Sequence, residues 1–101
     1  MVLTVFRSRL RSEALQAYQP WAARMNELAR TMPGYVSHKT FTADDGERVT
    51  LVEFESEAAQ RAWAIHPEHL DAQHRGRSEF YSEFRIQVCS VVRESRYAQK
   101  K

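Results

Sequence analysis

Three of the four histidines lie within nine residues, in the stretch AWAIHPEHLDAQHRG at 62–76. Imidazole titrates near neutral pH and is a common metal ligand, so such a cluster suggests proton transfer or metal binding. Pro67 separates His66 from His69, which predicts that His66 caps a helix and His69 lies in its first turn. His74 follows His69 by five residues, about 140° around a helix. Because zinc needs three or four converging ligands, we expect no metal here and a solvated His74.

The rest of the chain predicts the elements that must position these side chains. Alternating β-branched and aromatic residues indicate strands, and apolar residues at 3.6-residue spacing indicate helices. In chain order the pattern predicts a strand at 2–10, a helix at 12–32 capped by Ser12 and interrupted by Pro20, a hairpin of strands at 35–42 and 47–54, a helix at 56–81 capped by Ser56 and restarted at Pro67, and a strand at 84–93. This β-α-β-β-α-β order predicts an α+β, ferredoxin-like fold with an antiparallel sheet and helices on one face.

Both faces of the predicted sheet carry apolar residues. The first strand has Val2 and Phe6 on one side and Leu3 and Val5 on the other. Helices can cover only one face, so we expect the sheet of a second copy to cover the other, in a homodimer. One domain is expected over 1–95, followed by a polar, basic tail at 96–101.

Composition excludes several classes of protein. With 43% hydrophobic and 28% charged residues among 101, the chain is typical of a globular domain. No apolar run approaches the ~20 residues of a membrane span, and no signal-peptide pattern is present, so a cytoplasmic location is expected. The single Cys89 is expected to be an inert, buried thiol. The net charge of +2 comes from mixed signs, and the strand at 48–55 lacks interleaved aromatics, so no nucleic acid is expected as a partner.

Two stretches, MPGY at 32–35 and RAWAIHPEH at 61–69, resemble the antibiotic biosynthesis monooxygenase family. GRSEFY at 76–81, the final apolar strand and the order of elements add to this resemblance. It implies a dimeric α/β barrel, in which two sheets pack together and a ligand cavity lies between each sheet and its helices. Its members include cofactor-free oxygenases of quinols and hydroxyanthrones, haem-degrading enzymes and small proteins with no settled role.

The resemblance also implies roles for single residues. Trp63 would line the cavity and His69 would accept a proton or hold the substrate anion; these are the candidate catalytic residues. Hydroxyanthrone-oxidising members have Asn one turn before the Trp, where this chain has Ala59. Haem-degrading members have a His ligand ten residues after it, where this chain has Gln73, with His74 one place further. They also carry Asn in the first strand, where Arg7, Ser8 and Arg9 stand here.

A second group of residues are candidates for binding substrate. His38 and Arg85 would supply polar contacts, and the others would supply apolar lining: Phe41, Phe54, Phe80 and Tyr81. The sequence thus favours a monooxygenase without cofactor or metal, acting on a small aromatic quinol- or hydroxyanthrone-like compound. A non-catalytic ligand-binding or interaction module of the same fold is the alternative, and a haem-binding or haem-degrading protein is less favoured.

Overall fold

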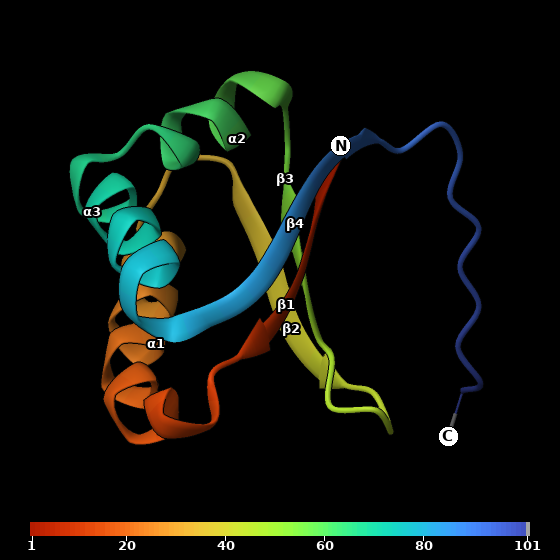
Figure 1. Ribbon diagram of the computed structural model, residues 1–101. Helices are drawn as coiled ribbons and strands as arrows, with labels where there is room; N and C mark the ends of the chain where they lie inside the picture. The colour runs from red at the N-terminus through yellow and green to blue at the C-terminus, as the bar shows by residue number, and fades with distance from the viewer. Residues whose placement is uncertain (101) are drawn as a thin grey trace.

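The computed structural model describes residues 1–100, and its helices all lie on one face of a single four-stranded sheet (Figure 1). The elements in chain order are β1 (Val2–Leu10), the 3-10 turn η1 (Ser12–Ala14), α1 (Leu15–Arg30), β2 (Tyr35–Thr42), β3 (Arg48–Phe54), α2 (Glu57–Ala64), α3 (Pro67–Arg75), the π-helical turn η2 (Gly76–Phe80) and β4 (Tyr81–Ser90). No helix within 1–100 is long and apolar enough to cross a membrane.

The strands lie in the order β2-β3-β1-β4, and every neighbouring pair is antiparallel. This arrangement confirms the predicted ferredoxin-like fold. Pairing fixes which side chains share a face, because successive residues of a strand point to opposite faces. Thr4 lies opposite Val52 and Val88, and Phe6 opposite Thr50 and Ile86. From β1, β3 and β4, therefore, even-numbered side chains point toward the helices.

Apart from Tyr81, which lies beyond the bulge, the odd-numbered side chains of these strands form the other face, which we call the outer face. It includes Leu3 and Val5 of β1 with Val49 and Leu51 of β3. No helix covers it in Figure 1, where the C-terminal segment after β4 runs beside it without regular structure. Cys89 lies on this face and is exposed, so the expectation of a buried thiol is wrong for the single chain.

Two of the three predicted helix caps are confirmed. Ser56 Oγ accepts a hydrogen bond from the Ala59 N–H at 3.1 Å, and His66 Nδ1 accepts one from the Glu68 N–H at 3.2 Å. The prediction for Ser12 is wrong, because the chain begins a 3-10 turn there and the Ser12 hydroxyl instead bonds to Glu13. Pro20 does not restart α1 but lies within it, where it removes one backbone donor on the exposed side.

The last strand begins at Tyr81, three residues before the predicted start at Phe84. The helical spacing that extended the predicted helix to Tyr81 ends in the η2 turn. There the Arg11 N–H donates to the Phe80 carbonyl at 2.8 Å, and Tyr81 pairs with Leu10 across a bulge. The Tyr81 ring also meets the Phe6 ring edge-on at 5.5 Å. These tertiary contacts outweigh local periodicity and turn Tyr81 into the first residue of the strand.

The most buried part of the core joins α1, β3 and α2 through Ala29, Phe54 and Trp63. Phe54 is fully buried, with 0% of its surface exposed. Gly34, in the MPG turn, has φ of +82°, a conformation that glycine adopts at little cost. A Cβ atom at this position would lie 2.6 Å from that of Ala59. The turn therefore needs glycine for both its backbone angle and its close approach to α2.

Candidate active site

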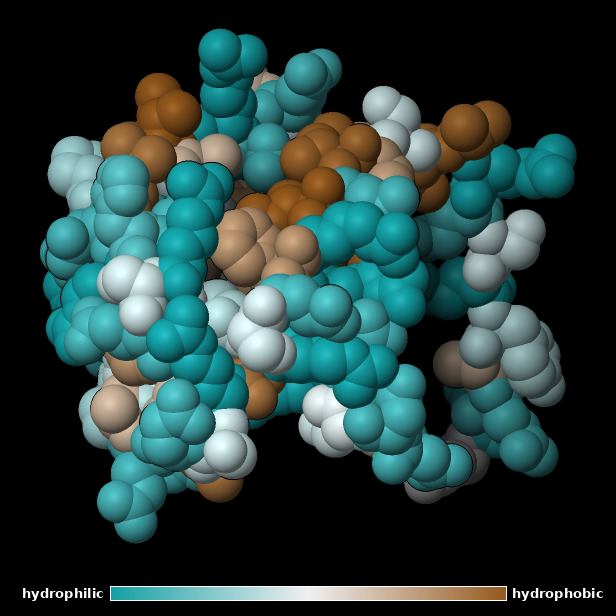
Figure 2. Space-filling view, viewed as in Figure 1, coloured by the Kyte–Doolittle hydropathy of each residue, from teal (hydrophilic) through white to brown (hydrophobic). Residues whose placement is uncertain are grey.

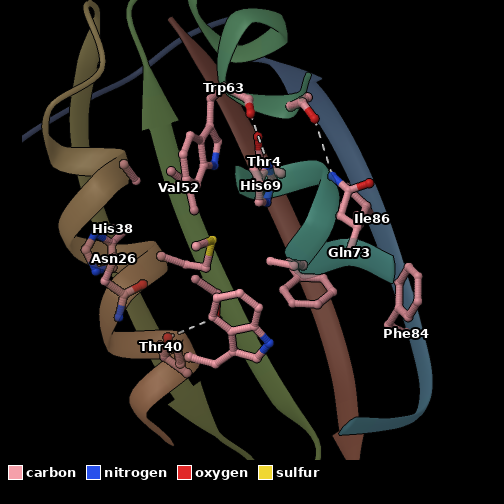
Figure 3. A pocket seen from close by; sticks show the side chains of 18 of the residues that line it. Thr4, Asn26, His38, Thr40, Val52, Trp63, His69, Gln73, Phe84 and Ile86 are labelled. Atoms are coloured by element: carbon pink, nitrogen blue, oxygen red, sulfur yellow. Dashed lines mark hydrogen bonds between the residues drawn. The ribbon is translucent and has the colours of Figure 1, made fainter. Parts of the chain in front are cut away.

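A cavity of about 210 Å³ lies between the sheet and the helices (Figure 3). One wall is a stripe of α1 at helical spacing, from Tyr18 to Ala29, and the floor is the even-numbered face of the sheet. The lining residues are Thr4, Phe6, Tyr18, Trp21, Ala22, Met25, Asn26, Ala29, His38, Thr40, Arg48, Thr50, Val52, Gln60, Trp63, Ala64, His69, Ala72, Gln73, Phe80, Tyr81, Phe84 and Ile86.

The cavity opens toward solvent beside the edge strand β4. Ile86 lines it and yet remains 45% exposed, and Val88 on the same face is 49% exposed. β4 crosses the middle of the view in Figure 2, where hydrophobic side chains gather between hydrophilic ones. A small apolar molecule can therefore reach the cavity without unfolding of the sheet.

Trp63 and His69 form a stacked pair in the cavity wall. Their ring centroids are 4.2 Å apart and the rings are 11° from parallel. His69 Nδ1 lies 3.0 Å from the Trp63 carbonyl oxygen, a bond drawn dashed in Figure 3. Because a carbonyl only accepts, Nδ1 must carry the hydrogen. In the neutral ring Nε2 then keeps a free electron pair, and no side chain or backbone group in 1–100 binds it.

Burial makes the neutral form of His69 the stable one. Desolvation lowers the pKa of His69 below its ordinary value of 6.5, and the nearby His66 adds to this effect. The bond to the Trp63 carbonyl acts the other way but does not reverse the shift. His69 is therefore an uncharged imidazole at neutral pH, able to accept a proton at Nε2.

Other polar side chains face the cavity from both sides. Gln73 Nε2 donates to the Ala64 carbonyl at 3.4 Å and ties α3 to α2, while His38 and Asn26 lie across the cavity from it (Figure 3). His38 Nδ1 is hydrogen-bonded to the Tyr35 hydroxyl. Burial and the charge of Arg30 lower the pKa of His38, so this ring is also neutral at pH 7.

A cluster of one arginine and two tyrosines lies at the end of the cavity near the start of β3. The Arg48 guanidinium carbon lies 5.2 Å from the centre of the Tyr18 ring. The Tyr81 hydroxyl donates to the Tyr18 hydroxyl at 3.4 Å. Burial is the main reason that the pKa of Tyr81 is raised, so its phenol keeps its proton.

Five of the eight predicted site residues line the cavity: Trp63, His69, His38, Phe80 and Tyr81. Phe54 points to the same side of the sheet but is enclosed in the core. Phe41 and Arg85 are odd-numbered strand residues, and both point to the outer face. Their placement follows from strand alternation, which sends their side chains away from His38 and Phe84.

The histidine cluster does not converge. His66 caps α3, His69 stacks on Trp63, and His74 is exposed. Within 1–100 no three His, Cys, Asp or Glu side chains come together as metal ligands. Ala59 packs against the core and the Gly34 turn and does not line the cavity. Gln73 lines the cavity at the position where haem-degrading members have a His ligand of the iron.

Sequence reasoning missed several lining residues, among them Tyr18, Trp21, Arg48 and Gln60. Tyr18 and Trp21 belong to the apolar stripe that predicts the first helix. Arg48 shares the even-numbered positions of its strand with Thr50 and Val52. The sequence therefore carried both patterns. Only the packing of α1 over β3 shows that these side chains enclose one cavity.

The fold and this cavity define a class of small α+β proteins that enclose a ligand-sized space between sheet and helices. The sequence model of the family "antibiotic biosynthesis monooxygenase" matches residues 1–75. This chain belongs to the antibiotic biosynthesis monooxygenase family. The matched part ends with α3, so β4 and its lining residues lie outside it.

The chain is also similar to individual proteins. The uncharacterised protein YqjZ of Bacillus subtilis (strain 168) is 32% identical over 87 residues, which cover 86% of this chain and 76% of YqjZ. The structure of Rv0793 from Mycobacterium tuberculosis superposes with a TM-score of 0.82 at 20% identity, covering 94% of this chain and 98% of that one. SnoaB of Streptomyces nogalater, a cofactor-independent oxygenase, gives a TM-score of 0.77 at 18% identity, covering 92% and 94%. The two structural likenesses establish the fold.

Proposed function

We propose that the protein is a cofactor-independent monooxygenase of a small aromatic, quinol- or hydroxyanthrone-like compound. The observation that carries the proposal is the neutral, half-buried His69, stacked on Trp63 in the cavity wall with Nε2 free. Family membership and the likeness to SnoaB support the same reaction type. Trp63 and His69 are the proposed catalytic residues, while His38, Phe80 and Tyr81 line the binding space.

The chemistry needs a base and a dry cavity. His69 Nε2 accepts the proton of a substrate hydroxyl, and the resulting anion transfers an electron to dioxygen. A carbon–oxygen bond then forms, and loss of water leaves an oxidised ring that carries one oxygen atom from dioxygen. The substrate supplies all four electrons, so the other oxygen atom leaves as water. Apolar walls protect the reactive anion from solvent.

The volume of the cavity favours a small substrate. An engineered cavity of about 150 Å³ in another protein binds benzene. At about 210 Å³ this cavity has room for one or two fused rings, and its opening beside Ile86 leaves space for a substituent. A bicyclic quinol therefore fits better than a three-ring hydroxyanthrone.

The proposal predicts oxygen uptake by purified, chelator-treated protein supplied with a panel of one- and two-ring dihydroquinones. Uptake above the uncatalysed rate, in proportion to protein concentration, is the expected result. Tight binding of these compounds without uptake would contradict catalysis and would favour the non-catalytic ligand-binding module, since apolar walls serve binding equally well.

The outer face supports a second part of the proposal, a homodimer whose two sheets pack together. Leu3, Val5, Val49 and Leu51 point to this face, and no helix covers them. The expected mass in light scattering is twice that of one chain. Leu51→Arg is expected to yield single chains, because the buried charge would lack a partner, whereas Ile65→Arg at an exposed site leaves the mass unchanged. A wild-type mass of one chain would contradict the dimer.

The same proposal places the protein in the cytoplasm. Cys89 is a free, exposed thiol, which is typical of proteins in a reducing compartment. Export of the protein in fractionated cells would contradict this location.

A further inference from the structure

One end of the cavity is positively charged. Among the lining residues within 1–100, Arg48 alone carries a fixed charge, and no carboxylate lines the space. His38 and His69 are both held neutral by burial. A guanidinium stays ionised at physiological pH, so the cavity has a net positive charge before any ligand binds.

Arg48 has no ion-pair partner in the part of the chain that the structure describes. The carboxylates nearest to it along the chain are engaged elsewhere: Glu47 pairs with Arg7 at 2.9 Å, and Asp45 pairs with Arg9 at 2.8 Å. Arg7 and Arg9 are odd-numbered and belong to the outer face. Arg48 instead lies over the Tyr18 ring, beneath the helices.

The two phenols beside Arg48 add hydrogen-bond donors. Since the Tyr81 hydroxyl donates to the Tyr18 oxygen, the hydrogen of Tyr18 remains available to another acceptor. A planar guanidinium presents parallel N–H groups that match the two oxygens of a carboxylate. Arg48 and Tyr18 together are therefore suited to an anionic oxygen group.

Arg48 and the reacting end lie at different points along the same cavity. Val52 packs against the core around Trp63, and it lies four residues from Arg48 on β3. Four residues of strand span about 13 Å. A ring against Trp63 and His69 would thus carry its acidic substituent toward Arg48.

We propose that Arg48 and Tyr18 bind the carboxylate of a one- or two-ring aromatic acid, which makes the substrate an aromatic carboxylate. This inference rests on the proposed function for its reacting ring. The carboxylate is a fixed handle: it orients the ring and makes the acid bind more tightly than a neutral compound of the same shape.

The experiment compares two probes of nearly equal shape that do not react with oxygen, 2-naphthoate and 2-naphthamide, by isothermal titration calorimetry. The wild-type protein is expected to bind 2-naphthoate about 10- to 100-fold more tightly than the amide. Arg48→Gln is expected to remove this preference while leaving amide binding unchanged. Arg48→Lys, which keeps the charge but not the paired N–H groups, should retain part of it.

Arg61→Gln is the matched control, since Arg61 is exposed on α2 and does not line the cavity. Equal affinity for the two probes, equal losses for both in Arg48→Gln, or no binding of either would overturn the inference. Circular dichroism confirms that each variant is folded. Because neither probe turns over, a failure here is distinct from a failure of oxygen uptake with neutral quinols, which tests the proposed function.

Discussion

Replacing His69 with glutamine is expected to lower kcat for oxygenation by about 10²- to 10⁴-fold, the usual contribution of a positioned base. Glutamine keeps a polar group of similar size that can still donate to the Trp63 carbonyl, but it cannot accept a proton at neutral pH. KM should change by less than about threefold, since the apolar walls and Arg48, which this substitution leaves unchanged, hold the substrate. Stopped-flow oxygen consumption at saturating substrate measures the effect.

The pH dependence follows from the lowered pKa of His69. Only the neutral ring can act as base, so activity is present above the pKa in the folded protein and is lost as pH falls through it. Because burial lowers that pKa in the free protein, the acidic limb of the kcat/KM profile should lie below 6.5. This limb should be absent from His69→Gln.

His74→Gln provides the control, because His74 lies on the same helix and is exposed. Its activity and pH profile should match those of the wild type. Wild-type kcat in His69→Gln, or an unchanged acidic limb, would show that His69 is not the base.

Replacing Trp63 with alanine is expected to lower the free energy of unfolding by about 3–5 kcal/mol, the range for truncation of a large buried aromatic. Trp63 is 7% exposed and packs with Ala29 and Phe54, so its loss leaves an empty space in the core. Urea unfolding at one fixed protein concentration measures the change, since a dimer's stability depends on concentration.

Ile65→Ala, next to the end of α2 and 60% exposed, is the control and should change stability by less than about 0.5 kcal/mol. A loss in Trp63→Ala as small as in the control would contradict the core packing. Trp63→Phe separates the two roles of this side chain, because it keeps most of the apolar volume. It should remain folded while losing activity, since a phenyl ring covers less of His69.

Much of the fold was predictable because it rests on local signals. Alternation places the strands 2–10 and 35–42 as observed, and Ser56 and His66 cap their helices through side chains with a suitable acceptor. The start of β4 was not predictable, since Tyr81 becomes a strand residue only through its pairing with Leu10. The spacing of apolar residues around Tyr81 fits both a helix and a strand. The pairing with Leu10, a residue distant in the sequence, decides between them.

The candidate site was predictable in part. Trp63 and His69 lie six residues apart on neighbouring helices, so one stretch of sequence carries both. Arg48 and Tyr18 are thirty residues apart, and only the packing of α1 over β3 brings them together. Phe41 and Arg85 were placed in the site by residue type, although strand alternation sends both to the outer face.

Mass spectrometry of the product formed under isotope-labelled dioxygen shows directly whether the protein inserts one atom of dioxygen into its substrate. It uses chelator-treated protein free of added cofactor and a two-ring dihydroquinone that consumes oxygen in its presence. We expect one labelled oxygen atom in each product molecule, with formation dependent on His69. An unlabelled product, or one formed equally fast by His69→Gln, would contradict this expectation.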